Sequence, residues 1–163
     1  MTSFSIASLD AADLAFMREM LYEAAFWRAT TKRPPLEAAL RDPALALYVQ
    51  DWGRRGDHGL ITRLGTRRAG AVWVRQFDDD AHGYGYVDKH TPELSVAVAA
   101  EHRGIGAGRC LVAAMLVQLR LQGAHQVSLS VEIDNPACEL YESLGFTPLT
   151  AAEGAVTMVR SLS

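Results

Sequence analysis

The stretch that decides the fold of this chain is Glu101-His102-Arg103-Gly104-Ile105-Gly106-Ala107-Gly108-Arg109. Upstream of it, the valine-rich segment 93–98 is typical of a buried strand, and downstream, residues 110–122 are rich in Leu and Ala, as a helix is. Three glycines at alternate positions let the backbone approach a bulky ligand without Cβ collisions. The helix that follows directs its free N–H groups and its positive dipole end at this loop. Strand, loop and helix together therefore predict a site for a phosphate or pyrophosphate group.

Length and composition set the broad class of the protein. The 163 residues predict one domain over 1–163, and 49% hydrophobic with 21% charged residues is ordinary for a globular chain. A net charge of −3 without a basic run argues against nucleic acid as the main partner. The sequence has no signal-peptide pattern and no apolar run near the roughly 18 residues of a membrane span, so we expect no membrane partner and a cytoplasmic location. Cys110 and Cys138 are expected to be buried small hydrophobes rather than a disulfide or metal site.

The order of predicted elements favours a mixed sheet. Strands are predicted at 3–7, 58–64, 70–77, 93–99, 126–133, 146–149 and 156–160, and the turn between the second and third at 65–68. Helices are predicted from an Asp10 N-cap to about residue 25, at 35–41 and at 44–52. Two more are predicted, one after the glycine loop over 110–122 and one from Asn135-Pro136 to Gly145. A long polar loop covers 78–90. Mostly consecutive strands with few interposed helices predict an α/β (α+β) fold with a mixed sheet, not a doubly wound parallel one.

Two common phosphate motifs fit the glycine loop poorly. A Walker loop needs Lys and then Ser or Thr after its glycines, but Gly108 is followed by Arg109-Cys110. A dinucleotide fingerprint needs a third glycine where Arg109 stands, and an acidic residue about 20 positions further on at a strand end. A nucleotide-binding α/β protein therefore remains only a rival interpretation.

A third motif, Arg-x-x-Gly-x-Gly, is met by residues 103–108. The segment Leu129-Ser130-Val131-Glu132-Ile133-Asp134-Asn135-Pro136-Ala137-Cys138-Glu139-Leu140-Tyr141-Glu142-Ser143-Leu144-Gly145-Phe146 resembles the strand–helix signature of the GNAT superfamily of acyl-CoA-dependent N-acetyltransferases. The two blocks occur in order and correctly spaced over about 93–146. This resemblance implies a GNAT-like, mostly antiparallel central sheet flanked by helices, with acetyl-CoA as co-substrate and no metal.

The resemblance also implies roles for particular residues. The loop amides would bind the CoA pyrophosphate, the strand around Val98 would pair with the pantetheine arm, and Asn135 would contact the cofactor. The implied cofactor-binding residues are Val96, Val98, Arg103, Gly104, Ile105, Gly106, Ala107, Gly108, Arg109 and Asn135. The Tyr141 position would place a phenol near the thioester sulfur, which makes it an implied catalytic residue.

The chemistry of aminolysis agrees with these roles. A strand N–H near Val98 could stabilise the oxyanion that forms when an amine attacks a thioester. A phenol such as Tyr141 could protonate the departing thiolate, whose conjugate acid has a pKa of about 8.5. For the base that deprotonates the amine, Glu93 at the start of the central strand is the first candidate. His82, His90 and Glu132 stay open, because a general base is identified by geometry.

These observations predict an enzyme that transfers an acetyl group from acetyl-CoA to a primary amine by direct attack in a ternary complex. The acceptor, a small-molecule or peptide amine, is expected between the 26–35 loop, the 78–92 loop and the final hairpin. If Asp78-Asp79-Asp80 borders this site, it favours cationic amines. The resemblance is compatible with a homodimer. The alternative is a non-catalytic acyl-CoA-binding domain with a regulatory role.

Overall fold

The computed structural model describes residues 3–28 and 32–163, which form a seven-stranded sheet in the order β1-β2-β3-β4-β5-β7-β6. The strands are β1 (Phe4–Ser8), β2 (His58–Leu64), β3 (Arg67–Arg75), β4 (Glu93–Val98), β5 (Gln126–Glu132), β6 (Thr147–Ala152) and β7 (Ala155–Ser161). The α-helices are α1 (Leu14–Ala25), α2 (Leu36–Ala39), α3 (Pro43–Ala46), α4 (Ala107–Leu121) and α5 (Ala137–Ser143). Within the described residues only the β4–β5 pair is parallel. The predicted mixed, mostly antiparallel sheet is therefore confirmed.

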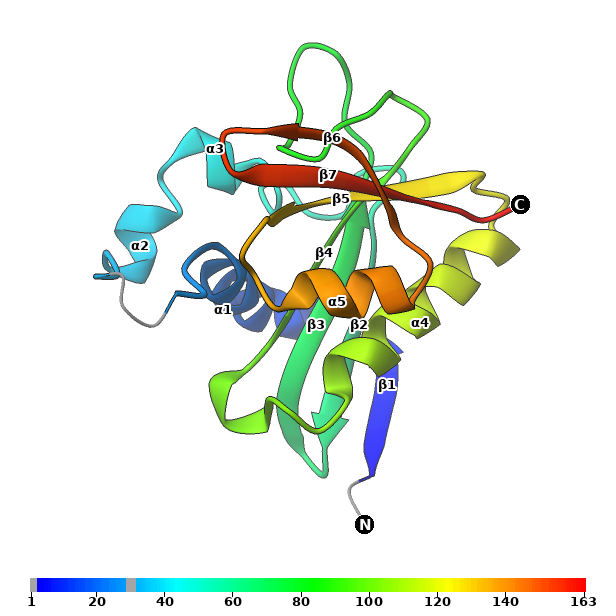
Figure 1. The fold of residues 1–163 in the computed structure, drawn as a ribbon. Coiled ribbons are helices and arrows are strands. Elements are labelled where there is room, and N and C mark those ends of the chain that lie inside the picture. The colour runs from blue at the N-terminus through cyan, green and yellow to red at the C-terminus, as the bar shows by residue number, and fades with distance from the viewer. Residues whose placement is uncertain (1–2, 29–31) are drawn as a thin grey trace.

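Helices cover both faces of the sheet. In Figure 1, α4 lies in front of β2 and β3, and α1 lies behind them. Alternating residues of the strands supply two apolar cores, because successive side chains of a strand point to opposite faces. Trp73 packs with Met17 of α1 on one face, and Val72 packs with Leu111 of α4 on the other. Within the described residues no helix is both long and apolar enough to cross a lipid bilayer.

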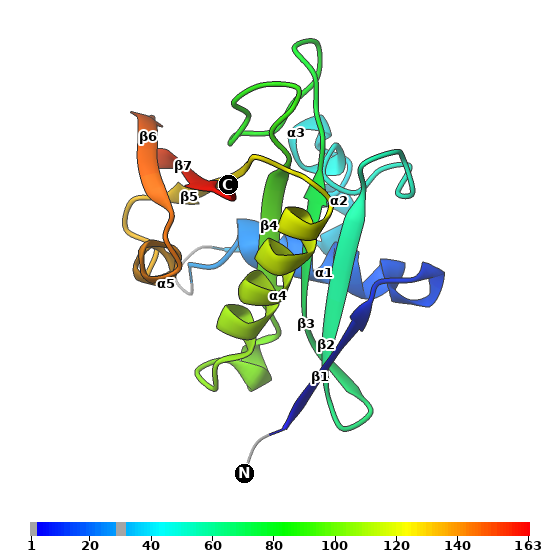
Figure 2. The ribbon, with the colours of Figure 1, turned by 90° about the vertical axis from the view of Figure 1, so that its right-hand side faces the viewer.

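The sheet divides between β4 and β5. These strands pair at Glu93 and Ser128 alone, where the Ser128 N–H donates to the Pro92 carbonyl at 3.0 Å. Beyond that point β4 pairs only with β3. Figure 2 shows β5, β6, β7 and α5 standing apart from the half that holds β1–β4. Within the described residues, one edge of β4 therefore has no strand partner beyond Glu93.

The hydrogen-bond pattern identifies the groups on this open edge. In an antiparallel ladder, successive residues direct their N–H and C=O groups alternately toward and away from the partner strand. The Ala99 N–H donates to the Ala69 carbonyl at 2.8 Å, so the odd-numbered residues of β4 bond to β3. Val96 and Val98 consequently direct their backbone polar groups away from β3, toward the open side.

Some predicted boundaries were wrong. The helix predicted at 44–52 ends at Ala46 and continues as turns, because the carbonyls of Leu47 and Gln50 accept hydrogen bonds from Arg75 at 2.9 and 2.6 Å. Helix α4 begins at Ala107, inside the glycine loop, rather than after it. The expectation of two buried cysteines was also wrong, since Cys110 is exposed and Cys138 is only half-buried.

The predicted N-cap at Asp10 is confirmed, and it supports a stability prediction. Asp10 accepts from the Ala12 N–H at 2.9 Å, and Asp13 accepts from the Asp10 N–H at 3.0 Å, which together form a capping box. Asp10→Ala removes one acceptor from the start of this helical segment. We expect the free energy of unfolding to fall by about 1 kcal/mol, measured by urea denaturation. An unchanged transition midpoint and slope would contradict this role for the cap.

Candidate active site

The glycine loop presents a run of unpartnered backbone donors. The N–H groups of residues 104–109 donate to no acceptor within 3–28 and 32–163, whereas the Arg103 N–H donates to the Ala100 carbonyl at 3.4 Å. Gly104 and Gly106 have φ angles of 80° and 90°, where a residue with a Cβ is strained. A Cβ on either would meet nothing within 4 Å, so the space outside the loop is open. Because these donors lie at the N-terminus of α4, they form a cluster of backbone donors suited to an anion.

Side chains join the loop to the elements on both sides of it. Arg103 donates from Nε to the Val98 carbonyl at 3.0 Å and from Nη2 to Glu23 at 3.1 Å. Arg109 donates to the Ser143 hydroxyl of α5 at 2.6 Å. A Cβ on Gly108 would lie 3.6 Å from Val98 Cγ2, so the loop lies against the end of β4. The donor run and the open edge of β4 are therefore adjacent.

Two of the predicted residues lie in or just before helix α5. Asn135 Oδ1 accepts from the Ala137 N–H at 2.9 Å, so the side chain caps the helix, although α5 begins at Ala137 rather than at Pro136. Tyr141 is buried and packs edge-on against Phe146, with ring centroids 5.9 Å apart. Its hydroxyl makes no hydrogen bond within the described residues. Burial, and to a lesser extent Cys138, raises the pKa of Tyr141, so the phenol keeps its proton at neutral pH.

Glu93 is a buried carboxyl group at the point where β4 and β5 join. Its side chain is 3% exposed, and Oε2 accepts a hydrogen bond from the Tyr48 hydroxyl at 2.5 Å. Oε1 has no hydrogen-bond partner within the described residues. Burial raises the pKa of Glu93 to about 7, while the Tyr48 hydrogen bond, the nearby Gly85 backbone and the charge of His82 oppose that rise. A carboxyl group that titrates near neutral pH and has a free oxygen has the properties of a general base.

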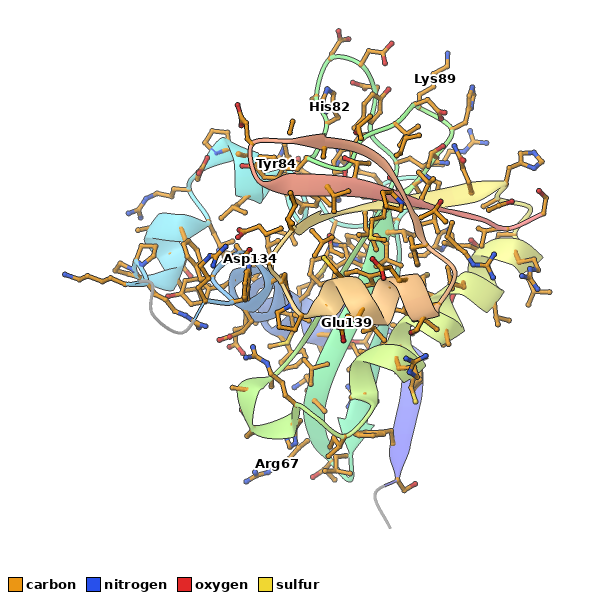
Figure 3. All side chains as sticks on the ribbon, in the orientation of Figure 1. Arg67, His82, Tyr84, Lys89, Asp134 and Glu139 are labelled. Carbon is orange, nitrogen blue, oxygen red and sulfur yellow. The ribbon has the colours of Figure 1, made fainter. Side chains whose placement is uncertain are left out.

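The 78–92 loop closes over this end of the sheet. The Tyr84 N–H donates to the Tyr48 hydroxyl at 2.8 Å, and Ser128 of β5 donates to the Gly85 carbonyl at 2.7 Å. Figure 3 shows Tyr84 beside the β6–β7 hairpin, with His82 and Lys89 on the loop above the sheet. The His82 ring stacks on Tyr86 with centroids 4.3 Å apart. The loop is thus tied to the Glu93 region and to β5.

The other predicted base residues lie in different surroundings. His90 is exposed, and its N–H donates to Asp88 at 2.8 Å. Glu132 accepts from Arg28 at 2.9 Å, and Arg28 also donates to Asp134 at 2.6 Å. These bonds join the segment after α1 to the end of β5, where Figure 3 labels Asp134. The predicted acceptor loop 26–35 is described only in part, because residues 29–31 lie outside the described residues.

Sequence reasoning missed Tyr48. It falls in the segment 44–52, which was predicted to be a helix, and no motif includes it. Its hydroxyl nevertheless contacts both Glu93 and the 78–92 loop. A partner 45 positions away from Glu93 in the chain leaves no local pattern, so only tertiary structure could identify it.

The chain is similar in sequence to known proteins. A family model described as the acetyltransferase (GNAT) family matches residues 17–146. A mycothiol acetyltransferase of Corynebacterium glutamicum (strain R) is 44% identical over 89 residues, which is 47% of this chain and 30% of that protein. The chain therefore spans about a third of the length of the curated relatives it matches.

Solved structures share the fold. The PaiA N-acetyltransferase of Thermoplasma acidophilum, solved in complex with coenzyme A, has a TM-score of 0.73 at 16% identity, over 98% of this chain and 99% of that one. The ribosomal-protein-S18-alanine N-acetyltransferase of Escherichia coli has a TM-score of 0.68 at 21% identity, over 99% and 95% of the two chains. At these identities the likeness is one of fold.

Proposed function

Because the chain belongs to the acetyltransferase (GNAT) family, we propose that it transfers an acetyl group from acetyl-CoA to a primary amine. The amine attacks directly in a ternary complex, without a covalent enzyme intermediate. The observation that carries this proposal is the run of unpartnered N–H groups at 104–109 beside the open edge of β4. Those donors suit a pyrophosphate, and the strand edge suits an amide-containing arm.

The residues of this chain would suit both the diphosphate and the amide-containing arm of acetyl-CoA. The amides of residues 104–109 would hold the diphosphate, and the backbone groups of Val96 and Val98 would pair with the pantetheine arm. Arg103 and Arg109 line the same loop and would add positive charge, and Asn135 would contact the arm from the start of α5. When bound, acetyl-CoA supplies an activated acyl carbon and a thiolate leaving group.

Two side chains would handle protons. Glu93 would accept a proton from the acceptor amine at Oε1, directly or through water, because this oxygen has no partner among residues 3–28 and 32–163. Tyr141 would donate its phenolic proton to the departing sulfur. Its hydroxyl has no competing acceptor within the described residues, and burial keeps it protonated.

Tyr141→Phe tests the proposed acid. The substitution keeps the packing against Phe146 and removes only the hydroxyl. We expect kcat to fall about 10²-fold while the affinity for CoA is unchanged, since a general acid acts on the chemical step. Single-turnover acetylation and calorimetry with CoA measure the two quantities separately. A kcat equal to that of the unsubstituted protein would remove Tyr141 from the mechanism.

The proposed acceptor is a small-molecule or peptide amine that binds near the 78–92 loop and the β6–β7 hairpin. Release of CoA from acetyl-CoA should be followed across a panel of amines. The panel should contain polyamines, peptides with N-terminal alanine, amino acids and the acceptor of mycothiol acetyltransferases. Turnover with at least one amine, and none when the amine is omitted, supports the proposal. Tight CoA binding without turnover on any amine would favour a non-catalytic acyl-CoA-binding domain.

A further inference from the structure

We propose that Tyr48 is a positioning residue for the reaction, orienting the Glu93 carboxylate and tying the 78–92 loop to it. This inference rests on the proposed function, in which Glu93 accepts the proton of the amine. The Tyr48 hydroxyl donates to Glu93 Oε2 at 2.5 Å and accepts from the Tyr84 N–H at 2.8 Å. Both functions of one hydroxyl are thus in use, and Oε1, which is buried, has no hydrogen-bond partner within the described residues.

Tyr48 is itself held firmly by β3. Trp73 donates from its indole N–H to the Tyr48 carbonyl at 3.2 Å. On the same face of β3, Arg75 donates to the carbonyls of Leu47 and Gln50, which flank Tyr48 in sequence. Arg75 also forms a buried bidentate pair with Asp57 at 3.0 and 2.8 Å. These contacts fix the turn that carries Tyr48, and a group held in this way can orient another.

The loop packs tightly against the same pair. Gly83 is buried, and a Cβ there would lie 2.7 Å from Glu93 Oε1 and closer still to the Tyr48 hydroxyl. No side chain fits at that distance, so residue 83 must be glycine for Tyr48 and Glu93 to keep their arrangement. Gly83→Ala is therefore a second way to disturb the pair without removing either member.

The groups that surround Glu93 determine the pH at which its carboxyl group ionises. The neutral Tyr48 hydroxyl faces it from the 47–51 turn, His82 acts on it from the loop, and Arg75 lies opposite it on β3 with its charge paired by Asp57. Ser128, its neighbour on β5, carries no charge. The hydrogen bond from Tyr48 lowers the pKa of Glu93. Removing the bond must therefore raise the pH at which the carboxyl group ionises.

The test is Tyr48→Phe, followed by two readouts. Titration of the Glu93 carboxyl by ¹³C NMR, assigned by comparison with Glu93→Gln, should show a midpoint higher by about one to two pH units. The acid limb of kcat/KM should move by the same amount, with the affinity for CoA unchanged. Gly83→Ala should also displace the titration midpoint. The control Tyr86→Phe removes a hydroxyl of the same loop that bonds Asp79, and it should leave the Glu93 midpoint in place.

Each outcome decides the proposal. An unchanged midpoint in a folded Tyr48→Phe protein overturns it, and so does a midpoint that moves while the rate profile stays the same. If the unsubstituted protein turns over no amine, the proposed function fails, whereas the NMR titration still shows whether Tyr48 orients Glu93. If Glu93→Gln remains fully active, Glu93 is not the base and Tyr48 has no reaction to position.

Discussion

Glu93→Gln is expected to lower kcat by about 10²- to 10⁴-fold, because an amide cannot accept the proton of the attacking amine. Gln keeps the size of the side chain and can still accept the Tyr48 hydrogen bond. Binding of CoA, which is proposed to occur at residues 104–109 and along β4, should not change. Steady-state kinetics with an amine that is turned over measures kcat, and calorimetry with CoA measures the affinity for CoA.

The pH dependence adds a second, independent signature. The pKa of Glu93 is about 7, so the carboxylate form is lost as the pH falls through neutrality. We expect kcat/KM of the unsubstituted protein to fall tenfold per pH unit well below 7, unless the amine itself dominates the profile. Glu93→Gln should lose this limb. Comparing two amines of different pKa separates the enzyme group from the substrate group.

Two of the other candidate bases, Glu132 and His90, provide the controls for this experiment. Glu132→Gln and His90→Gln change groups that lie outside the buried Tyr48–Glu93 pair. If either costs more activity than Glu93→Gln, the assignment moves to that residue. If all three substitutions have small effects, either His82 is the base or the proton leaves through water without a single base, and His82→Gln distinguishes the two.

As the pH rises, ionisation of Glu93 should increase activity but decrease the free energy of unfolding. Because burial raises the folded pKa of Glu93 above its unfolded value, the unfolded chain releases this proton first as the pH rises. The unsubstituted protein should therefore lose stability from Glu93 between about pH 4.5 and 7. Glu93→Gln lacks this loss, and above pH 7 it should be more stable by about 3 kcal/mol, since each pH unit of the shift corresponds to about 1.4 kcal/mol. Denaturation curves at pH 5 and pH 8 measure the difference.

Gly106→Glu is expected to weaken CoA binding by about 10²-fold or more. The added carboxylate would occupy the open space outside the loop and would repel the diphosphate that the amides are proposed to bind. The residue would also adopt a φ of 90°, at a cost of about 1–2 kcal/mol in stability. Calorimetry with CoA measures the affinity, and urea denaturation measures the strain.

Gly123→Glu is the matched control for this substitution. Gly123 follows the other end of α4, has a φ of 85°, and a Cβ there would also meet nothing within 4 Å. It should show a similar loss of stability, with a further small cost because a carboxylate is unfavourable at a helix C-terminus. Its CoA affinity should be unchanged. Equal losses of affinity in the two variants would place the diphosphate somewhere other than the 104–109 loop.

Local signals predicted most of the elements, for identifiable reasons. The Asp10 cap, the alternation in 126–132 and the glycines around α4 are short-range patterns, and each produced the expected element. The helix predicted at 44–52 was too long, because carbonyls of this segment accept hydrogen bonds from Arg75, whose position depends on β3. The sequence predicted donor amides at about residues 103–108, but only the structure shows that the unpartnered amides within the described residues are those of 104–109, because the Arg103 N–H donates to the Ala100 carbonyl.

The sequence by itself determined the order of strands and helices along the chain and the glycine loop at the start of α4. It also determined the resemblance to the GNAT superfamily, from which acetyl transfer was expected. These depend on residue type and spacing within about 20 positions, which periodicity and motifs report directly. The tertiary structure alone decided that β4 and β5 separate, that Glu93 is buried, and that Tyr48 bonds to it. Burial and pairing across 45 positions arise from packing of distant segments, and packing determines the pKa on which the proposed catalysis depends.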